Sequence, residues 1–443
     1  MARRTDRTHT RSNRSRRLTA AAVTLTLSLS LVACGGTDDS PDDSTDAGPP
    51  GTSDGAGPTA AEVRRQEQRI LDQRVRAVRD RDLDLFLKRV DRDDAALVAR
   101  QARYFRNLVQ LPWATFGYRV LDQQWDRVRV VPRWGKNVDI PQVQLTTQLA
   151  GYDAVPVKRT VGFVFSFRKG RATIVSDRTS AGKPLYRGAP APWDLTAITV
   201  REKPGVLGIF DDATRASADM VTTAVRTGIG QIDRSLPFTW SGKVVVYSAQ
   251  DPKVLATFTN VPGGSLDHLG ALTVPTYAEG GPQVASTRML VLPSSINAGQ
   301  RFLGRITRHE LSHVAIGIRD DGAPAWVSEG IAEYLGAREI PQRERIIPTS
   351  ALVRAQTEDV AMPVSKTFND ADQEWHYALS WMACDYIADT FGEPRLWELV
   401  EATHNGGEGT SDDQQDRVLL QLVGFDSAEL ARRAAARIRT LYG

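Results

Sequence analysis

The chain has 443 residues, of which 41% are hydrophobic and 25% are charged, so it is long enough for two or three globular domains. Residues 1–33 carry seven Arg and one Asp, a charge of +6, which leaves −3 for the remainder of a chain whose formal charge is +3. In that remainder Arg is mixed with Asp and Glu and forms no basic stripe, so we predict that the protein does not bind nucleic acid.

The first 58 residues are predicted to target and tether the protein rather than to fold. An Arg-rich start precedes the apolar run Leu18–Ala33, which is shorter than the ~20 residues of a membrane-spanning helix. We interpret residues 1–33 as a signal peptide. Residues 34–58 contain six Asp and no cation, a composition that predicts a disordered acidic tether.

The end of the signal peptide, Leu31-Val32-Ala33-Cys34, resembles a bacterial lipobox. That resemblance implies a lipoprotein whose Cys34 thiol is lipidated, anchored to the cell membrane on its extracytoplasmic face. An ordinary secretory signal with an incidental cysteine is the alternative, and the choice between Sec and twin-arginine export stays open. The other cysteine, Cys384, has apolar neighbours at helical spacing and is predicted to be a buried structural residue.

Residues 59–180 are predicted to form an α+β domain. Apolar periodicity predicts three helices, one from residue 59 to about 78, one over 83–90 and one through 97–104. Alternating apolar and polar residues then predict strands at 115–121, 126–131, 142–149, 157–167 and 172–175. Helices followed by an antiparallel meander resemble the NTF2-like cone, in which a curved sheet cups its helices. This resemblance rests on element order, and we interpret the domain as accessory.

The segment 181–191, rich in Pro and Gly, is predicted to be a linker, and residues 192–443 a second α+β domain with a small mixed sheet and a helical C-terminal half. Strands are expected at 195–209, 244–247 and 289–292, with a helix at 213–232. The strand Arg288–Leu292 is expected either at the edge of the sheet, where an extended substrate would pair with it, or in the interior.

The pentapeptide His309-Glu310-Leu311-Ser312-His313 predicts a zinc site. It lies in a Pro-free run, 300–318, that is predicted to be helical, so the two histidines stand one turn apart on one face and can reach the same ion. Glu310 would lie beside the metal, where it can accept a proton from water. The histidines elsewhere in loops or in the signal, His9, His268 and His404, are interpreted as surface residues rather than ligands.

A second helix, predicted to begin at Pro324, follows closely and carries two acids four residues apart, Glu329 and Glu333. Catalytic zinc has three protein ligands and one open position, so one acid is expected to bind the ion and the other to support it. Gly330 is expected to let the two helices approach closely. A separate apolar stripe of this helix is formed by Val327, Ile331 and Leu335.

The two motifs, H-E-L-S-H and P-A-W-V-S-E-G-I-A-E-Y, resemble those of the gluzincin metallopeptidases, in particular the bacterial peptidase MA-like domains. The resemblance implies one Zn²⁺ ion held by His309, His313 and Glu329, with Glu333 hydrogen-bonded to a ligand histidine. Glu333 as the third ligand is the alternative. The fifteen residues between His313 and Glu329 are fewer than in the thermolysin-like branches, a departure that leaves the third ligand open.

The same resemblance implies a peptidase in which a zinc-activated water attacks the peptide bond of a peptide or protein substrate, with Glu310 as general base. Tyr377, in a helix that opens at Trp375, is the candidate donor to the oxyanion, and His376 is the alternative. Two alternative functions use the same residues. One is a non-catalytic binding lipoprotein, which a fourth protein ligand to zinc would favour, and the other is a metallohydrolase of a non-peptide amide in the cell wall.

Overall fold

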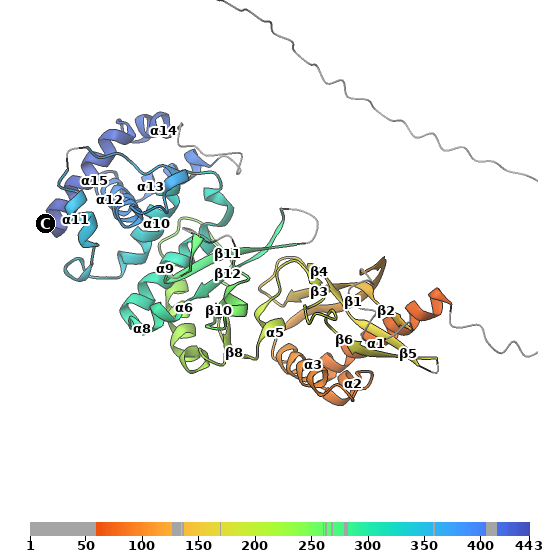
Figure 1. Ribbon diagram of the computed structural model, residues 1–443. Helices are drawn as coiled ribbons and strands as arrows, with labels where there is room; N and C mark the ends of the chain where they lie inside the picture. Colours follow the sequence, from red (N-terminus) through yellow and green to blue (C-terminus); the bar gives the residue numbers. More distant parts are fainter. Residues whose placement is uncertain are drawn as a thin grey trace, which may run out of the picture. The chain divides into compact units, whose positions relative to one another are not determined.

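The computed structural model describes residues 59–443 apart from 126–133, 135–136, 169, 260, 262–263, 267–268, 279–281, 358 and 405–413. Residues Gly57–Gly443 form one compact unit of mixed α+β structure, as expected for the fold class (Figure 1). The predicted signal peptide, Cys34, the acidic tether, His9, His268 and the strand predicted at 126–131 lie outside the described residues.

Three helices open the described part of the chain, as the apolar periodicity predicts. Each begins at a residue whose side chain accepts a hydrogen bond from a backbone N–H of the first turn: Thr59, Asp82 and Asp94. The caps satisfy donors that have no partner within a helix, and so they fix where each helix starts. The helices are α1 (Ala60–Asp80), α2 (Leu83–Leu87) and α3 (Ala95–Leu108).

Antiparallel strands follow and form two small sheets within the described residues, in the orders β1-β3-β4-β7 and β2-β5-β6. The strand predicted at 157–167 is wrong as a single element, because the chain bends at Phe163 and passes from one sheet to the other. A Cβ on Gly162 at this bend would lie 2.5 Å from Nε1 of Trp125, so the bend requires glycine. The strands are β1 (Trp113–Gln124), β2 (Val138–Asp139), β3 (Pro141–Leu149), β4 (Val157–Gly162), β5 (Val164–Arg168), β6 (Arg171–Ser176) and β7 (Tyr186–Arg187).

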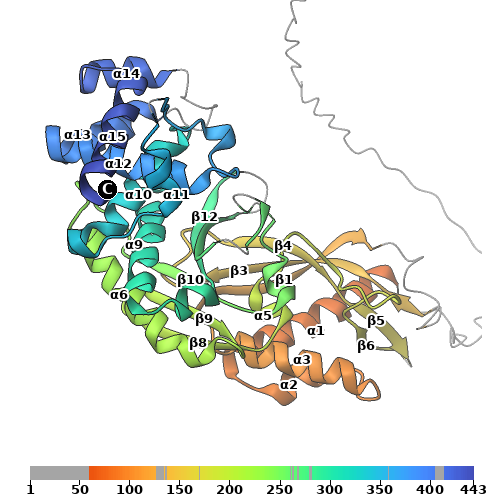
Figure 2. The ribbon, with the colours of Figure 1, turned by 60° about the vertical axis from the view of Figure 1, so that its left-hand side comes forward.

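The helices pack on these strands through apolar side chains. Figure 2 shows α1 and α3 running beneath β1 and β3, and Leu71 of α1 shares a buried cluster with Val143 and Phe165. Strand β7 pairs with β4, so residues 186–187 of the predicted linker belong to the first sheet. The division into domains at residues 181–191 stays a prediction.

A five-stranded mixed sheet forms the centre of the second half, in the order β11-β12-β10-β9-β8. The single strand predicted at 195–209 is wrong, because this stretch is a hairpin that turns at Pro204-Gly205, where Gly205 has a φ of 80°. Proline followed by a residue with positive φ favours such a turn. The elements are α5 (Pro192–Leu195), β8 (Ile198–Lys203), β9 (Val206–Asp211), β10 (Val244–Ser248), β11 (Ala271–Tyr277) and β12 (Val284–Val291).

The order of the strands decides between the two alternatives for Arg288–Leu292. Strand β12 pairs with β11 on one side and with β10 on the other, so it lies in the interior of the sheet. The strand at the edge next to β12 is β11, which runs antiparallel to β12 and was not predicted from the sequence. It carries Pro275, and strands tolerate proline chiefly at sheet edges.

The two faces of this sheet have different neighbours. Helices α6 (Ala218–Asp233) and α9 (Gln300–Ile316) cover one face, where Val246 and Met289 are fully buried (Figure 1). The other face joins a cluster that includes residues of α3. At its border the carboxylate of Asp153 bonds to the guanidinium of Arg288 and to the hydroxyl of Ser286, so a buried ion pair joins the two halves of the compact unit.

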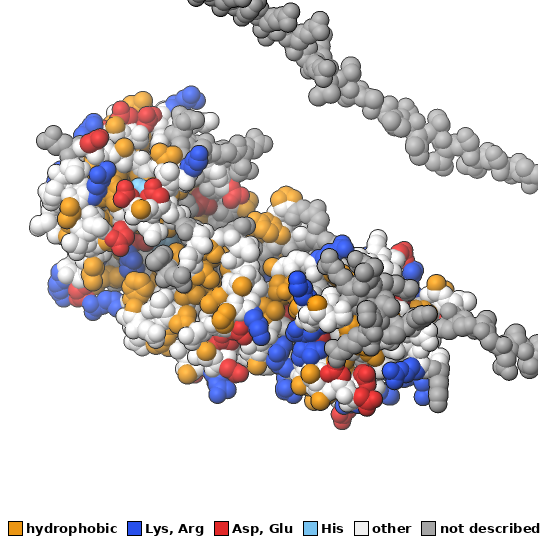
Figure 3. Space-filling view, in the orientation of Figure 1, with side chains coloured by type: hydrophobic (Ala, Val, Ile, Leu, Met, Phe, Trp, Pro, Cys, Tyr) orange, Lys and Arg blue, Asp and Glu red, His pale blue; other side chains and the backbone are white. Residues whose placement is uncertain are grey.

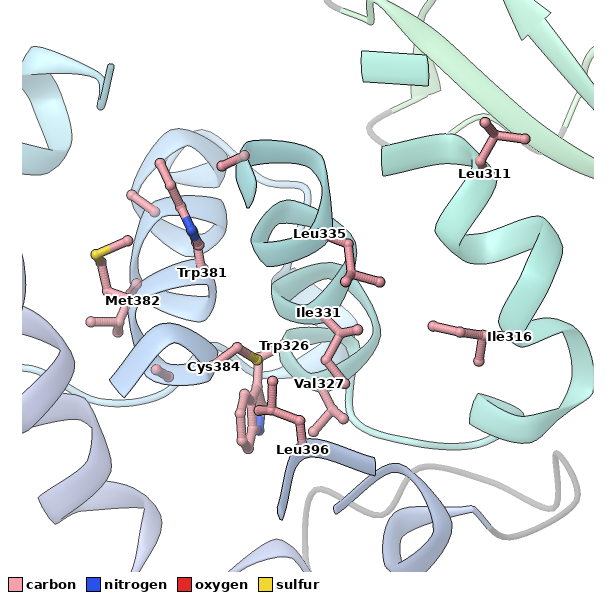
Figure 4. Packing of buried hydrophobic residues seen from close by; sticks show 14 of the residues in the cluster. Leu311, Ile316, Trp326, Val327, Ile331, Leu335, Trp381, Met382, Cys384 and Leu396 are labelled. Atoms are coloured by element: carbon pink, nitrogen blue, oxygen red, sulfur yellow. The ribbon is translucent and has the colours of Figure 1, made fainter. Parts of the chain in front are cut away.

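Helices fill most of the C-terminal half, as predicted. The stripe predicted for α10 (Ala325–Arg338) is fully buried, and Figure 4 shows Val327, Ile331 and Leu335 in one apolar cluster with Leu311 and Ile316 of α9. Among the described residues, none of the helices combines the length and the apolar character that crossing a membrane requires. The remaining helices are α7 (Pro252–Leu255), α8 (Pro293–Asn297), α10 (Ala325–Arg338), α11 (Thr349–Arg354), α12 (Gln373–Phe391), α13 (Pro394–Thr403), α14 (Gln415–Leu422) and α15 (Ser427–Tyr442), with 3₁₀ turns at Arg215–Ser217, Gly317–Asp320, Gln342–Glu344 and Ser365–Thr367.

The role predicted for Gly330 is wrong in one respect. A Cβ at Gly330 would lie 2.6 Å from the carbonyl oxygen of Ser380 on α12, so this glycine brings α10 close to α12 rather than to α9. The glycine that faces α9 is Gly336, whose Cβ would lie 3.2 Å from the carbonyl oxygen of Arg305. Cys384 packs against Gly330 and is fully buried, as predicted (Figure 4).

Candidate metal centre

The two histidines of the pentapeptide lie one turn apart on α9, and their imidazole rings converge on one site. Their Nε2 atoms are 3.3 Å from each other, and the imidazole rings meet edge to face with centroids 5.0 Å apart. Helix α9 begins after Gly299 and runs without interruption through both residues, so the i, i+4 spacing is converted directly into proximity.

Helix α10 brings Glu329 to this point. Its Oε2 atom lies 3.3 Å from Nε2 of His309 and 3.5 Å from Nε2 of His313. The same oxygen is buried and accepts no hydrogen bond from any described residue. A buried carboxylate oxygen without a donor is rare in folded proteins, and here it faces two imidazole nitrogens.

These three distances fit a tetrahedral zinc ion. Ligand atoms about 2.0–2.1 Å from the centre of a tetrahedron lie about 3.3–3.4 Å from one another. The observed values, 3.3, 3.3 and 3.5 Å, match that edge length. Among the described residues, His309, His313 and Glu329 form the group of histidine, cysteine or acidic side chains that could hold a metal ion. The donor set of two nitrogens and one oxygen suits zinc.

Glu333 lies behind the site rather than in it. Its Oε1 atom is 3.0 Å from Nδ1 of His309, the ring nitrogen that faces away from Glu329, and its Oε2 atom pairs with the guanidinium of Arg305. A carboxylate in this position orients a ligand histidine and fixes which ring nitrogen carries the proton. Arg305, in turn, holds the carboxylate in place.

The electrostatics of the group favour a cation. Burial alone would lower the pKa of His309, but the carboxylates of Glu329 and Glu333 outweigh it and raise that pKa to about 10. Burial would likewise lower the pKa of His313, and Glu329 raises it. Burial opposes ionisation of Glu329, yet the facing histidines hold its pKa well below the usual range. Positive charge at this point is therefore stabilised.

Glu310 points from α9 toward the edge strand. Its carboxylate accepts a hydrogen bond of 2.6 Å from the hydroxyl of Thr273 on β11. Glu310 is only 5% exposed, so this bond orients a carboxylate that has little contact with solvent. The candidate base thus lies between the histidine pair and the strand edge.

The two candidate oxyanion donors differ in position. The ring of Tyr377 lies 6.3 Å from that of His309, and burial, followed by the charge of Glu329, raises the pKa of its phenol well above the usual value. The hydroxyl therefore stays protonated. Nδ1 of His376 lies 2.8 Å from the carbonyl oxygen of Phe368. Of the two candidates, Tyr377 is the one whose ring contacts His309.

A pocket of about 610 Å³ borders β11, and its lining includes Thr273, Tyr247 and Arg288 but neither Glu310 nor the three candidate ligands. One side is formed by β11 from Thr273 to Tyr277, and the opposite side by Val157–Arg159 and by residues 188–193. Except for Pro192 and Trp193, the residues of this second side precede the predicted catalytic domain.

Two residues of the site were not predicted from the sequence. Arg305 precedes His309 by four residues on the same face of α9, so helical spacing could have identified it. Thr273 is 37 residues from Glu310, and no local pattern connects them. His404, interpreted as a surface residue, is exposed at the end of α13.

We compared the chain with known protein families and with curated proteins. No protein-family model matches the chain, and a search of curated proteins found no match.

Proposed function

We propose that the protein is a zinc-dependent peptidase of the gluzincin type, anchored by a lipid on the extracytoplasmic face of the cell membrane. The observation that carries the proposal is the set of tetrahedral edge distances among His309, His313 and Glu329, next to an acid in the general-base position. The small mixed sheet with an antiparallel edge strand beside α9 supports the gluzincin part. Helices followed by an antiparallel meander support an NTF2-like accessory domain over residues 59–180.

The third ligand in this proposal is Glu329, and Glu333 is the supporting acid. Only Glu329 has an oxygen near both Nε2 atoms, whereas Glu333 faces the opposite ring nitrogen of His309. The metal-binding group has three members among the described residues, which is the number that leaves a position open for water and substrate. That number supports catalysis over the binding-lipoprotein alternative.

The proposed reaction needs a zinc ion, which the chain itself does not supply. When bound, a zinc ion polarises a carbonyl group and lowers the pKa of a coordinated water toward ~7. Glu310 takes a proton from the attacking water and passes it to the leaving amine, and Thr273 holds its carboxylate in position for both transfers. The protonated hydroxyl of Tyr377 donates to the oxyanion. The substrate lies extended along β11, where main-chain pairing aligns the scissile bond.

The proposal is tested with a peptide library. We expect the purified protein to bind one zinc ion, to lose hydrolysis when a chelator removes the zinc, and to regain it when zinc returns. Substoichiometric zinc, or cleavage that does not depend on the metal, would contradict the proposal. Hydrolysis of cell-wall amides but not of peptides would keep the metal centre and change the substrate class.

The anchoring part of the proposal rests on Leu31-Val32-Ala33-Cys34. Mass spectrometry of the N-terminal peptide is expected to find acyl chains on Cys34. The Cys34→Ser variant should leave the membrane fraction, and a variant that stays membrane-bound would refute lipidation as the anchor.

A further inference from the structure

A second pocket lies in the N-terminal half, away from the metal centre. It has a volume of about 460 Å³, within the range of small-molecule sites, and its lining shares no residue with the proposed zinc site. Helix α3 forms one side and strands β1, β3 and β4 the other, with residues 184–186 and 194–195 at the rim.

The two acidic residues of this pocket are already neutralised. The Asp177 carboxylate accepts hydrogen bonds from Arg100 at 2.9 Å and from Gln101 at 2.9 Å. Asp194 accepts a bond of 2.7 Å from Arg159, and its second oxygen accepts one from the N–H of Ala191. These bonds occupy both carboxylates, so they leave little acceptor capacity for other cations.

Three further cations line the pocket without such partners. Arg178 lies 3.9 Å from Asp177, at the limit of an ion pair, and also donates to the carbonyl oxygen of Gly182 at 2.9 Å. Arg103 and Lys253 have no ion-pair partner among the described residues. The Nε atoms of Arg103 and Arg178 are buried and find no acceptor in the described chain. On the face shown in Figure 3, Lys and Arg side chains gather over α3 and α5, which carry part of this lining.

Among the three cations, Arg103 has the most donor capacity to offer an anion. The hydrogen bond that it donates within the described chain, to the carbonyl oxygen of Asp194, is long at 3.4 Å. Burial, followed by repulsion from Arg178, lowers the pKa of Arg103. Arg103 is half-buried but its Nε is fully buried, and a buried donor without an acceptor is costly unless a negative group completes it.

The rest of the pocket is apolar and aromatic. Leu145, Phe163 and Leu185 are buried, and the rings of Tyr104 and Tyr118 lie nearby with their hydroxyl oxygens 3.3 Å apart. A ligand that is charged throughout would leave this surface unused. A ligand with a charged head and an apolar body would contact both parts.

We propose that this pocket binds a small organic anion, whose carboxylate or phosphate is held by Arg103, Arg178 and Lys253 and whose apolar body packs against the tyrosines and buried apolar residues. The site does not depend on the proposed peptidase activity, so either proposal can fail without the other.

Calorimetric titration of the full chain with phenyl phosphate and with phenylacetate tests the proposal and distinguishes the two kinds of head group. We expect at least one of them to bind at least about tenfold more tightly than both inorganic phosphate and the neutral 2-phenylethanol, and to weaken as salt rises. Equal binding of the neutral compound, equal binding of inorganic phosphate, or no binding of either aromatic anion would overturn the proposal.

A pair of variants locates the site. Arg103→Gln should weaken anion binding by at least about tenfold, because it removes the charge and keeps a polar side chain. Arg106→Gln, an exposed position on the same helix, should leave binding unchanged. Lys253→Gln, at the exposed rim, is the variant to use if Arg103→Gln fails to fold, and it should weaken binding in the same direction. Anion affinity equal to wild type in the folded Arg103→Gln or Lys253→Gln protein would contradict the assignment.

Discussion

At the scale of single residues, the proposed metal centre depends on a chain of contacts that begins outside it. Arg305 pairs with Glu333, Glu333 faces Nδ1 of His309, and the opposite nitrogen of that ring faces Glu329. Each partner removes a degree of freedom from the next, so the imidazole is oriented before a metal arrives. The two acids of α10 therefore have distinct roles that separate measurements can resolve.

Glu333→Gln should weaken zinc affinity by about 10–100-fold, because the ligand histidine loses its orienting carboxylate. Glu329→Gln should weaken it further, since a ligand is lost. Competition with a chromophoric chelator at fixed pH measures both, and Glu339→Gln, exposed at the end of α10, is the matched control. A larger loss for Glu333→Gln than for Glu329→Gln would make Glu333 the third ligand.

Tyr377→Phe should lower kcat by about 10² while zinc affinity stays near wild type, because one donor to the oxyanion is lost and no ligand is removed. Steady-state kinetics on the preferred peptide gives this value. The comparison variant His376→Gln should lower kcat less. The opposite order would assign the role to His376.

Much of the site at this scale could be predicted from the sequence, since His309, His313, Glu329 and Glu333 lie at helical spacings that a helix converts into shared faces. Thr273 could not be predicted, because its contact with Glu310 depends on how a strand packs on a helix. A long-range contact of this kind leaves no periodic pattern in the chain.

At the scale of elements, α10 is held between two neighbours by two glycines with opposite roles. Gly336 allows α9 to pack closely against α10, and Gly330 allows α12 to do so. Helix α10, which carries Glu329 and Glu333, is therefore packed on two sides. The sequence indicated a close approach at Gly330 but not its partner. Periodicity shows which face of a helix is apolar, but it does not show which helix covers that face.

Gly330→Ala should destabilise the fold by about 1–3 kcal/mol, because the new Cβ meets the backbone of α12. Gly230→Ala is the matched control within α6, since its Cβ has space, with the nearest atom at 3.8 Å. That control should be neutral or stabilising by up to about 1 kcal/mol. Chemical unfolding in the presence of a chelator measures both, and equal stabilities would contradict the packing described for α10.

The edge strand shows the same limit of sequence analysis. The strand at 289–292 was predicted from its apolar run, but whether it lies at the edge depends on β11, whose mixed composition hid it. The hairpin β8–β9 was missed for a different reason, because the turn signal Pro204-Gly205 lies within an otherwise strand-like stretch. A Pro-Gly pair inside a strand-like run favours a turn over continuation of the strand.

At the scale of the whole molecule, buried ionisable groups join its parts and set how its stability depends on pH. Asp153 and Arg288 are one such pair, between the first half and the five-stranded sheet. Another is Glu67 of α1, which is 1% exposed and faces Asp139 of β2. Burial, followed by the charge of Asp139, raises the pKa of Glu67 to about 9.

The folded state therefore prefers the neutral form of Glu67, while the unfolded chain ionises near pH 4.5. The stability from this group is complete below about pH 4.5 and is lost as pH rises toward 9. Glu67→Gln, which imitates the neutral acid, should exceed wild type by about 1–3 kcal/mol at pH 8 and differ little at pH 4.5. Urea unfolding across this range measures the difference, with the exposed Asp72→Asn on the same helix as control. An advantage that does not change with pH would refute the pairing.

The central claim, that this geometry belongs to a zinc peptidase, is tested most directly by one rate comparison. Wild type and Glu310→Gln are loaded with one zinc ion each, and their initial rates are measured on the same peptide library. The account predicts that the variant retains zinc and loses at least about 10²–10⁴-fold in rate, because the ligands are intact and the general base is gone. Equal rates at equal zinc occupancy would contradict it.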